Sequence, residues 1–302
     1  MTPGAIDSSR GPIVVKLGGA AISTPRAGEA WPLGMAIAGL HRDAPAGVVV
    51  VHGGGAEVDA HLARLGMGVE RRAGLRVTPP EQIEEVAGVL AGKVNRRLVA
   101  MLGACGAPGV GLFLGDGSNA PGGPSFVCEK HTPDGVDLGL VGRLAGGSGS
   151  VLRAILDAGL MPVLSSIGAL PDGTLLNINA DDAADGIARI VNASAIVLLT
   201  DVPGVLDADR RLIPELDASA IESLIASGVI AGGMAPKVRA ALASATALGA
   251  PAVIASWKEP GSIAGLLRWD GPRPACTIVL PAAREPVRSA ASRVATSPED
   301  RA

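Results

Sequence analysis

The fold of this chain is decided by the stretch Ile13-Val-Val-Lys16-Leu-Gly18-Gly19, in which β-branched residues end abruptly at a glycine pair. A second stretch of the same kind is Val48-Val-Val-Val-His52-Gly53-Gly54-Gly55. This pattern is typical of a buried parallel strand that feeds a turn at the start of a helix. Glycine turns expose backbone N–H groups, and the helix dipole adds positive potential. Both turns therefore suit an anionic ligand such as phosphate.

Neither glycine turn decides the function alone. Gly18 and Gly19 also fit a plain tight turn beside a solvated Lys16. The segment His52–Gly55 is similar to the oxyanion loop of lipases and esterases, but that interpretation requires a Gly-x-Ser-x-Gly nucleophile elbow. The nearest stretch, Gly146-Gly-Ser-Gly-Ser150, lacks the final glycine. The sequence also contains neither a P-loop nor a dinucleotide fingerprint, which excludes those nucleotide-binding classes.

Composition indicates a well-buried globular protein. The chain has 302 residues, 48% of them hydrophobic, and a mean hydropathy of +0.38. This length predicts about two domains or lobes. A net charge of −3 and only three Trp, two Phe and no Tyr argue against nucleic-acid binding and base stacking.

Cysteine and histidine give no metal motif. The three cysteines are far apart, and the four histidines lack ligand spacing, so we expect structural or solvated roles and no protein metal site. His52 is the exception for which a functional role stays open, because it borders a glycine turn. No apolar run approaches the ~18 residues of a membrane span. The N-terminus has no signal-peptide core, so we expect a cytoplasmic protein.

Strands and helices alternate along the chain, which predicts an α/β fold with a mainly parallel central sheet sandwiched by helices. We predict disorder over 1–11 and 282–302 and polar hairpins or lids over 67–78 and 116–147. The predicted strands are 13–17, 47–51, 110–114, 161–166, 195–200, 252–255 and 276–280. The predicted helices are 80–102, one that begins near Ser219 with Glu222 in a capping box, and 235–248.

Three later segments carry further polar groups toward the same site. Arg76 lies in a hairpin-like stretch, and its guanidinium fork suits a carboxylate. Asn177-Ile-Asn-Ala-Asp181 ends an extended segment and opens a helix, where capping by Asn179 or Asp181 is the simpler interpretation. Lys237 follows a glycine pair in the first turn of a helix, an unfavourable place for a cation unless an anion binds there.

Together these motifs, in this order, resemble the amino-acid kinase family over about residues 12–281. The resemblance is strongest to its members that phosphorylate N-acetylglutamate, in their short dimeric form. The fold implied is carbamate kinase-like with two lobes. The motifs that carry it are Lys16–Gly19, His52–Gly55, Gly74–Thr78, Gly111–Gly117, Pro162–Gly168, Asn177–Asp181, Leu199–Leu206, Gly232–Lys237 and Ile254–Trp257.

The resemblance implies transfer of the ATP γ-phosphoryl group to the γ-carboxylate of N-acetyl-L-glutamate, a step of arginine biosynthesis. It implies an acetylglutamate-binding and dimerisation lobe over 12–192 and an ATP-binding lobe over 193–281. Mg²⁺ would be held mainly by the phosphates. A carboxylate is already ionised at neutral pH, so the reaction needs no general base, and positioning with charge neutralisation suffices.

The resemblance also implies a role for each matching residue. Lys16 and Lys237 would stabilise the transferring phosphoryl group from opposite sides, and Asp181 would hold both lysines. Arg76 would pair with the substrate α-carboxylate, and Asn177 would bind the same end. N–H groups would come from Gly18, Gly19, Gly54 and Gly55. The nucleotide pocket would be lined by Thr200, Asp201, Val202, Pro203, Gly204, Val205, Val229, Ile230 and Ala231, although an ordinary strand exit also explains the first six of these.

Two alternatives stay open at this point. One is a sibling kinase for another acylated amino acid such as N-acetyl-aminoadipate, and the other is a non-catalytic regulator on the same fold. Cys276 departs from the family, which usually has glycine before Thr277. The family's arginine-inhibited hexamers use an N-terminal helix, whereas the first twelve residues here include Pro3, Gly4, Gly11 and Pro12. We therefore expect a homodimer without that form of arginine inhibition.

Overall fold

The computed structural model describes residues 6–22, 30–72, 74–267 and 274–282. One large sheet has the order β11-β13-β12-β10-β1-β2-β8-β9-β7-β6, and β5 also pairs with β8. Its strands are β1 (Ile13–Leu17), β2 (Val48–His52), β5 (Gly109–Leu114), β6 (Val127–Lys130), β7 (Val141–Gly146), β8 (Met161–Ala169), β9 (Leu175–Ile178), β10 (Ala195–Thr200), β11 (Glu215–Leu216), β12 (Ala252–Ser256) and β13 (Cys276–Val279).

Most strand pairs in this sheet are parallel, including β1 with β2 and with β10, as predicted. The antiparallel pairs are β12–β13, β8–β9 and β6–β7. A separate two-stranded ribbon joins β3 (Arg71–Arg72) to β4 (Leu75–Arg76). The hairpins predicted within 67–78 and 116–147 are therefore confirmed.

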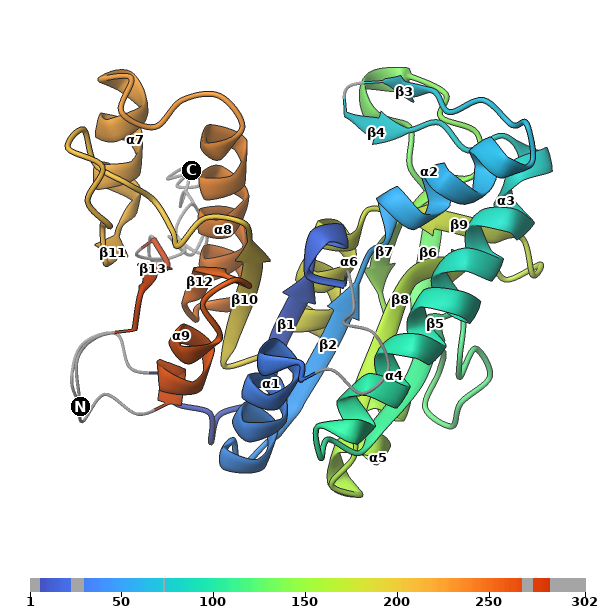
Figure 1. Cartoon of the computed structure of the whole chain (residues 1–302). Coiled ribbons are helices and arrows are strands. Elements are labelled where there is room, and N and C mark those ends of the chain that lie inside the picture. Colours follow the sequence, from blue (N-terminus) through green and yellow to red (C-terminus); the bar gives the residue numbers. More distant parts are fainter. Residues whose placement is uncertain (1–5, 23–29, 73, 268–273, 283–302) are drawn as a thin grey trace, which may run out of the picture.

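Helices cover both faces of the sheet. Successive residues of a strand point to opposite faces, so neighbouring residues of β1 pack against different helices. Ile13 and Val15 pack with α1, α2, α4 and α9 on one face, whereas Val14 packs with α5, α6, α7 and α8 on the other. Figure 1 shows α7 and α8 at the end of the sheet that holds β10–β13, and α2–α4 toward the opposite end. The helices are α1 (Pro32–Asp43), α2 (Gly55–Arg64), α3 (Pro80–Ala87), α4 (Asn95–Ala104), α5 (Ser150–Asp157), α6 (Ala180–Ile190), α7 (Ala218–Ala226), α8 (Met234–Leu248) and α9 (Pro260–Ala264).

The long helix predicted over 80–102 consists of three parts. A π-helical segment, Gly88–Val94, lies between α3 and α4. A π segment widens one turn of the helix and shifts the side chains that follow it, and such segments are common at functional sites. Asn95, the first residue of α4, is fully buried.

The capping box predicted at Ser219 is wrong. Helix α7 begins earlier, and the Asp217 carboxylate is its cap, because it accepts a hydrogen bond from the Ala220 N–H at 2.8 Å. Glu222 instead forms an ion pair with Arg239 of α8 at 3.2 Å. Aspartate and serine are both common helix caps, so the sequence pattern alone does not distinguish Asp217 from Ser219 as the cap of this helix.

The predicted disorder over 1–11 needs correction at its inner end. Ile6 is buried in the hydrophobic core, so the ordered chain begins before the first strand. Residues 1–5 lie outside the described residues. At the other terminus Ala282 is described, and its N–H donates to the Thr246 hydroxyl at 3.1 Å. Residues 283–302 also lie outside the described residues.

Candidate active site

The two glycine turns lie side by side at the carboxyl edge of the sheet. Strands β1 and β2 pair in parallel register, with Leu17 opposite His52, so both strands end at the same level. The Gly53 N–H donates to the Leu17 carbonyl at 3.2 Å. A Cβ placed on Gly19 would lie 3.9 Å from the Gly55 nitrogen. The predicted pair of N–H-rich turns is therefore one continuous surface.

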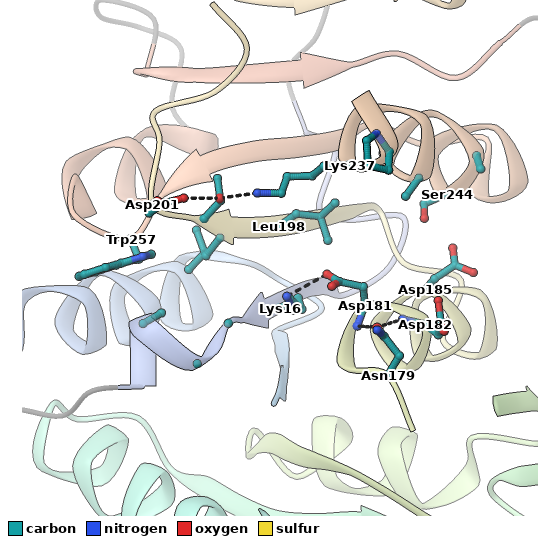
Figure 2. A pocket seen from close by; sticks show the side chains of 18 of the residues that line it. Lys16, Asn179, Asp181, Asp182, Asp185, Leu198, Asp201, Lys237, Ser244 and Trp257 are labelled. Atoms are coloured by element: carbon teal, nitrogen blue, oxygen red, sulfur yellow. Dashed lines mark hydrogen bonds and ion pairs between the residues drawn. The ribbon is translucent and has the colours of Figure 1, made fainter. Parts of the chain in front are cut away.

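Lys16 reaches this edge from the centre of the sheet. Its Nζ lies 2.9 Å from Asp181 Oδ1, and the Asp181 side chain is 56% exposed. Figure 2 shows the pair above the first turn of α6. The cap of this helix is Asn179, whose Oδ1 accepts from the Asp181 N–H at 2.8 Å. Because Asn179 caps the helix, the Asp181 carboxylate is available to the lysine.

Lys237 lies in the first turn of α8, as predicted, but its partner differs from the expected one. Its Nζ donates to the Thr200 hydroxyl at 2.7 Å, and that hydroxyl donates to Asp201 Oδ1 at 3.1 Å. The Asp201 backbone N–H, the Thr200 hydroxyl and Lys237 hold the pKa of Asp201 below its usual value. Among the described residues, Asp181 pairs with Lys16 and forms no ion pair with Lys237.

A cavity of about 850 Å³ contains both lysines. Its walls are α6, β10 and α8, and Figure 2 shows Lys237 and Lys16 extending into it from different elements. Gly18, Gly19, Asp181, Thr200 and Asp201 also line it. This volume accommodates a ligand of nucleotide size, because small-molecule sites are usually clefts of about 300–1,000 Å³. Trp257, the last residue of the motif Ile254–Trp257, forms part of the wall.

Most of the predicted nucleotide-binding residues do not line that cavity. Only Thr200 and Asp201 do, whereas Val205 and Ile230 are buried in the hydrophobic core. The loop of Val202, Pro203 and Gly204 follows β10 and is tied to β13, because the Val205 N–H donates to the Thr277 hydroxyl at 2.8 Å. Val229 and Ala231 flank Ile230 before α8. A nucleotide contact for the seven residues outside the cavity, 202–205 and 229–231, stays a prediction.

A smaller cavity of about 200 Å³ adjoins the glycine turn after β2. Gly54, Gly55, Arg76 and Asn177 line it. Asn179 lines both cavities, so they meet at the start of α6, beside the Lys16–Asp181 pair. The two lysines with Thr200 and Asp201, and the predicted acceptor-binding groups, therefore lie in two cavities that share Asn179.

Arg76 is held in the wall of the small cavity with part of its guanidinium unused. Its side chain is only 9% exposed, and Nη2 contacts Asp59 Oδ1 at 2.5 Å and the Gly55 carbonyl at 3.1 Å. Nη1 is buried and has no hydrogen-bond partner in the described part of the chain. A buried guanidinium nitrogen without a partner is costly, and Arg76 also lines the small cavity, where its planar fork suits a carboxylate.

Asp59 supports the wall of the small cavity, because it pairs with Arg71 and Arg76, which both line that cavity. The sequence did not reveal this role. Burial would raise its pKa, but hydrogen bonds from Arg71 and Arg76 outweigh that effect and hold the pKa below its usual value. The carboxylate thus stays charged and holds both arginines beside the small cavity. Its place on α2, four residues after Gly55, was the only available signal.

Asn177 is the third of the four residues of β9, and it lines the small cavity. Its Nδ2 donates to the hydroxyl of Thr78, which is fully buried. This bond fixes the side-chain amide, and its oxygen remains an acceptor for a substrate N–H.

The described residues hold no group of three or more His, Cys, Asp or Glu side chains arranged for a metal ion. No described helix combines the length and apolar character that crossing a bilayer requires.

Comparison with known proteins agrees with this geometry. The family model described as the amino acid kinase family matches residues 11–256. This chain belongs to the amino-acid kinase family. Within that family it is 42% identical over 257 residues to the protein named acetylglutamate kinase of Aeromonas salmonicida (strain A449), covering 84% of this chain and 94% of that protein. It is 43% identical to the protein of the same name from Colwellia psychrerythraea, over 86% of this chain and 94% of that one.

Solved structures of other family proteins share the fold. N-acetylglutamate synthase from Neisseria gonorrhoeae, complexed with coenzyme A and N-acetyl-glutamate, matches with a TM-score of 0.70 and 23% identity over 89% of this chain and 59% of that one. Carbamate kinase from Giardia lamblia bound to AMP-PNP matches with a TM-score of 0.56 and 20% identity, over 91% of this chain and 99% of that one. At these identities the likeness establishes the amino-acid kinase fold.

Proposed function

We propose that this protein phosphorylates the γ-carboxylate of N-acetyl-L-glutamate with ATP, giving N-acetyl-L-glutamyl 5-phosphate for arginine biosynthesis. The observation that carries the proposal is the meeting of two cavities at the Lys16–Asp181 pair. One cavity has the size of a nucleotide, and the other has an arginine, an amide and glycine N–H groups for a small acylated amino acid. The relatives named acetylglutamate kinase support the choice of substrate.

The reaction is a direct displacement at phosphorus. A γ-carboxylate oxygen forms a bond to the γ-phosphorus of ATP while the bond to the β–γ bridging oxygen breaks, and ADP leaves with that electron pair. The nucleophile is ionised near pH 7, since a glutamate carboxyl has a pKa of about 4.3. No proton has to be removed, so the protein contributes orientation and charge stabilisation.

The lysines supply most of that stabilisation. Lys16 and Lys237 approach the transferring group from different lobes and offset the charge that accumulates on its oxygens. Asp181 orients Lys16 and does not act as a base. The N–H groups of Gly18, Gly19, Gly54 and Gly55 bind the phosphoryl oxygens and the γ-carboxylate.

The remaining residues bind the two ends of the substrates. Arg76 takes the α-carboxylate with its guanidinium group, and Asn177 takes the acylated amino group. The nucleotide lies in the larger cavity beside Thr200 and Asp201, and the segments 202–205 and 229–231 border the nucleotide. Mg²⁺ arrives as part of MgATP and is held mainly by the phosphates, since this ion keeps its waters and prefers phosphate oxygens.

A colorimetric assay tests this proposal. The purified protein, MgATP and hydroxylamine are mixed with N-acetyl-L-glutamate, N-acetyl-aminoadipate or L-glutamate, and the hydroxamate that traps the acyl phosphate is measured. We expect product with acetylglutamate well above the other two. A preference for acetylaminoadipate would indicate the sibling kinase, and no product with any acceptor would indicate a non-catalytic regulator.

We further propose that the protein is a cytoplasmic homodimer joined through sheet and helix contacts of the lobe 12–192, with 193–281 as the ATP lobe. Val127 on the edge strand β6 is 42% exposed, which supports an apolar contact on that lobe. Light scattering at micromolar protein, with and without millimolar arginine, checks the assembly. A mass near six chains, or activity that falls as arginine is added, would contradict it.

A further inference from the structure

His52 is the last residue of β2 and has no part in the reaction described above, yet it lies beside the substrate-binding glycines. Its side chain is fully buried. Burial lowers the pKa of this imidazole to about 4, so the ring is neutral at physiological pH. A neutral imidazole has one N–H donor and one acceptor nitrogen, and the partners of each nitrogen therefore identify the tautomer.

The partners of His52 select a single tautomer. Nδ1 lies 2.8 Å from the carbonyl oxygen of Gly53, which can only accept, so Nδ1 carries the proton. Nε2 then accepts from Asn95 Nδ2 at 3.0 Å. The orientation of the Asn95 amide is set independently, because Nδ2 also donates to the Val163 carbonyl at 2.9 Å and Oδ1 accepts from Arg96 at 2.8 Å.

Two backbone features make room for this network. The π-helical segment Gly88–Val94 ends immediately before Asn95 and delivers its side chain into the core beneath the glycine turn. Gly111 of β5 leaves the necessary space, since a Cβ at that position would overlap Asn95 Oδ1 and the Arg96 guanidinium. Gly111 belongs to the motif Gly111–Gly117, to which the proposed reaction assigns no role.

We propose that His52 is a positioning residue: its Nδ1–H fixes the Gly53 carbonyl, and this orients the Gly54 N–H toward the substrate. Asn95 keeps His52 in the tautomer that donates to that carbonyl. The carbonyl and the following N–H of a trans peptide point in opposite directions. Holding the Gly53 carbonyl on the His52 side thus turns the Gly54 N–H away from it, and both glycines line the small cavity. The inference rests on the proposed function, in which Gly54 binds the acceptor.

Two substitutions at His52 separate positioning from packing. His52→Asn keeps a donor at the place of Nδ1 and loses the acceptor for Asn95. His52→Gln keeps a polar atom at the place of Nε2 and loses the donor to Gly53. Each removes one buried hydrogen bond, so we expect similar losses of thermal stability.

Their activities should differ. We expect kcat/KM for acetylglutamate to fall about tenfold or more in His52→Gln and less than about threefold in His52→Asn, because misdirecting one preorganised donor costs part of its full contribution. KM for ATP should stay unchanged in both. Equal losses in the two variants, or a His52→Gln enzyme within about twofold of the wild type, would overturn the proposal.

A matched pair on β5 tests the same network from a distance. Gly111→Ala forces Asn95 out of place, whereas Gly109→Ala meets only ordinary contacts, the nearest being a Val163 methyl at 3.5 Å. We expect Gly111→Ala to lower kcat/KM for acetylglutamate while Gly109→Ala does not. Equal activity of the two variants would contradict the proposal.

The wild-type protein provides a test that does not depend on any variant folding. Nitrogen-15 NMR of the histidine side chains should show His52 protonated at Nδ1 and unprotonated at Nε2 from about pH 5 to about pH 8. A proton on Nε2 would overturn the assignment. Wild-type activity with acetylglutamate tests the proposed function separately, so a failure of the positioning role is distinguishable from a failure of that function.

Discussion

The two lysines of the site differ in how the protein holds them. Lys16 extends from a central strand and is paired directly with a carboxylate, Asp181, at 2.9 Å. Lys237 extends from the first turn of a helix and is bonded to a hydroxyl, Thr200, with Asp201 one bond further away. The first lysine thus contacts its carboxylate directly, whereas a hydroxyl separates the second lysine from its nearest carboxylate.

In the proposed reaction, the two lysines would therefore contribute to charge stabilisation by different means. An ion pair fixes Lys16 where both cavities meet, so its position depends on the charge of residue 181. A hydrogen-bond relay fixes Lys237 at the positive end of a helix dipole, where a cation is unfavourable until an anion binds. Phosphate binding should therefore stabilise Lys237 more than it stabilises Lys16.

The largest effects should follow removal of either lysine. Lys16→Ala and Lys237→Ala should each lower kcat by about 10²–10³-fold with a much smaller change in KM, because a preorganised electrostatic group is worth ~3–4 kcal/mol in the transition state. Steady-state kinetics with saturating MgATP measures this. A kcat near the wild-type value in either variant would remove that lysine from phosphoryl stabilisation.

The relay to Lys237 is tested at Thr200. Thr200→Val removes the hydroxyl with little change of shape, and we expect kcat to fall about tenfold because Lys237 loses its fixed position. Thr200→Ser is the matched control and should keep most of the activity. If valine and serine give the same kcat, the relay does not position the lysine.

Arg76 should affect binding more than rate. Arg76→Lys preserves the charge but loses the planar fork, so we expect KM for acetylglutamate to rise about tenfold with a modest change in kcat. Measuring KM for both substrates separates this from a general loss of structure, since KM for ATP should not move. An unchanged KM for acetylglutamate would place Arg76 outside the substrate site.

The smallest effect should come from the support behind Arg76. Asp59→Asn leaves a neutral partner of nearly the same shape, and we expect KM for acetylglutamate to rise about threefold as the arginine becomes less fixed. The effect should shrink on combination with Arg76→Lys, since both act through one contact. Fully additive losses would show that Asp59 acts elsewhere.

Local patterns in the sequence predicted the fold well. Valine-rich runs that end at glycines can form little other than buried parallel strands, and strands such as 13–17 and 195–200 match the structure residue for residue. Element ends were less predictable. The cap of α7 is Asp217 and not Ser219. The apolar residues within 80–102 recur at helical spacing through the π segment, so periodicity did not reveal it.

The candidate site was predictable where residues lie in motifs and not where they depend on distant partners. Lys16, Asp181, Arg76 and Asn177 lie around the junction of the two cavities. The partners of these groups come from other elements, as with Asp59 behind Arg76 and Thr200 beneath Lys237. Such contacts depend on how helices dock on the sheet, which single-sequence patterns do not encode.

In the proposed reaction, a carboxylate oxygen of acetylglutamate attacks the γ-phosphorus of ATP directly. Acetylglutamate labelled with oxygen-18 in its γ-carboxylate tests this step, with phosphorus-31 NMR of the product. We expect an acyl phosphate signal that carries the isotope shift of one labelled bridging oxygen and that disappears on addition of hydroxylamine. An acyl phosphate without the shift, or release of inorganic phosphate alone, would contradict it.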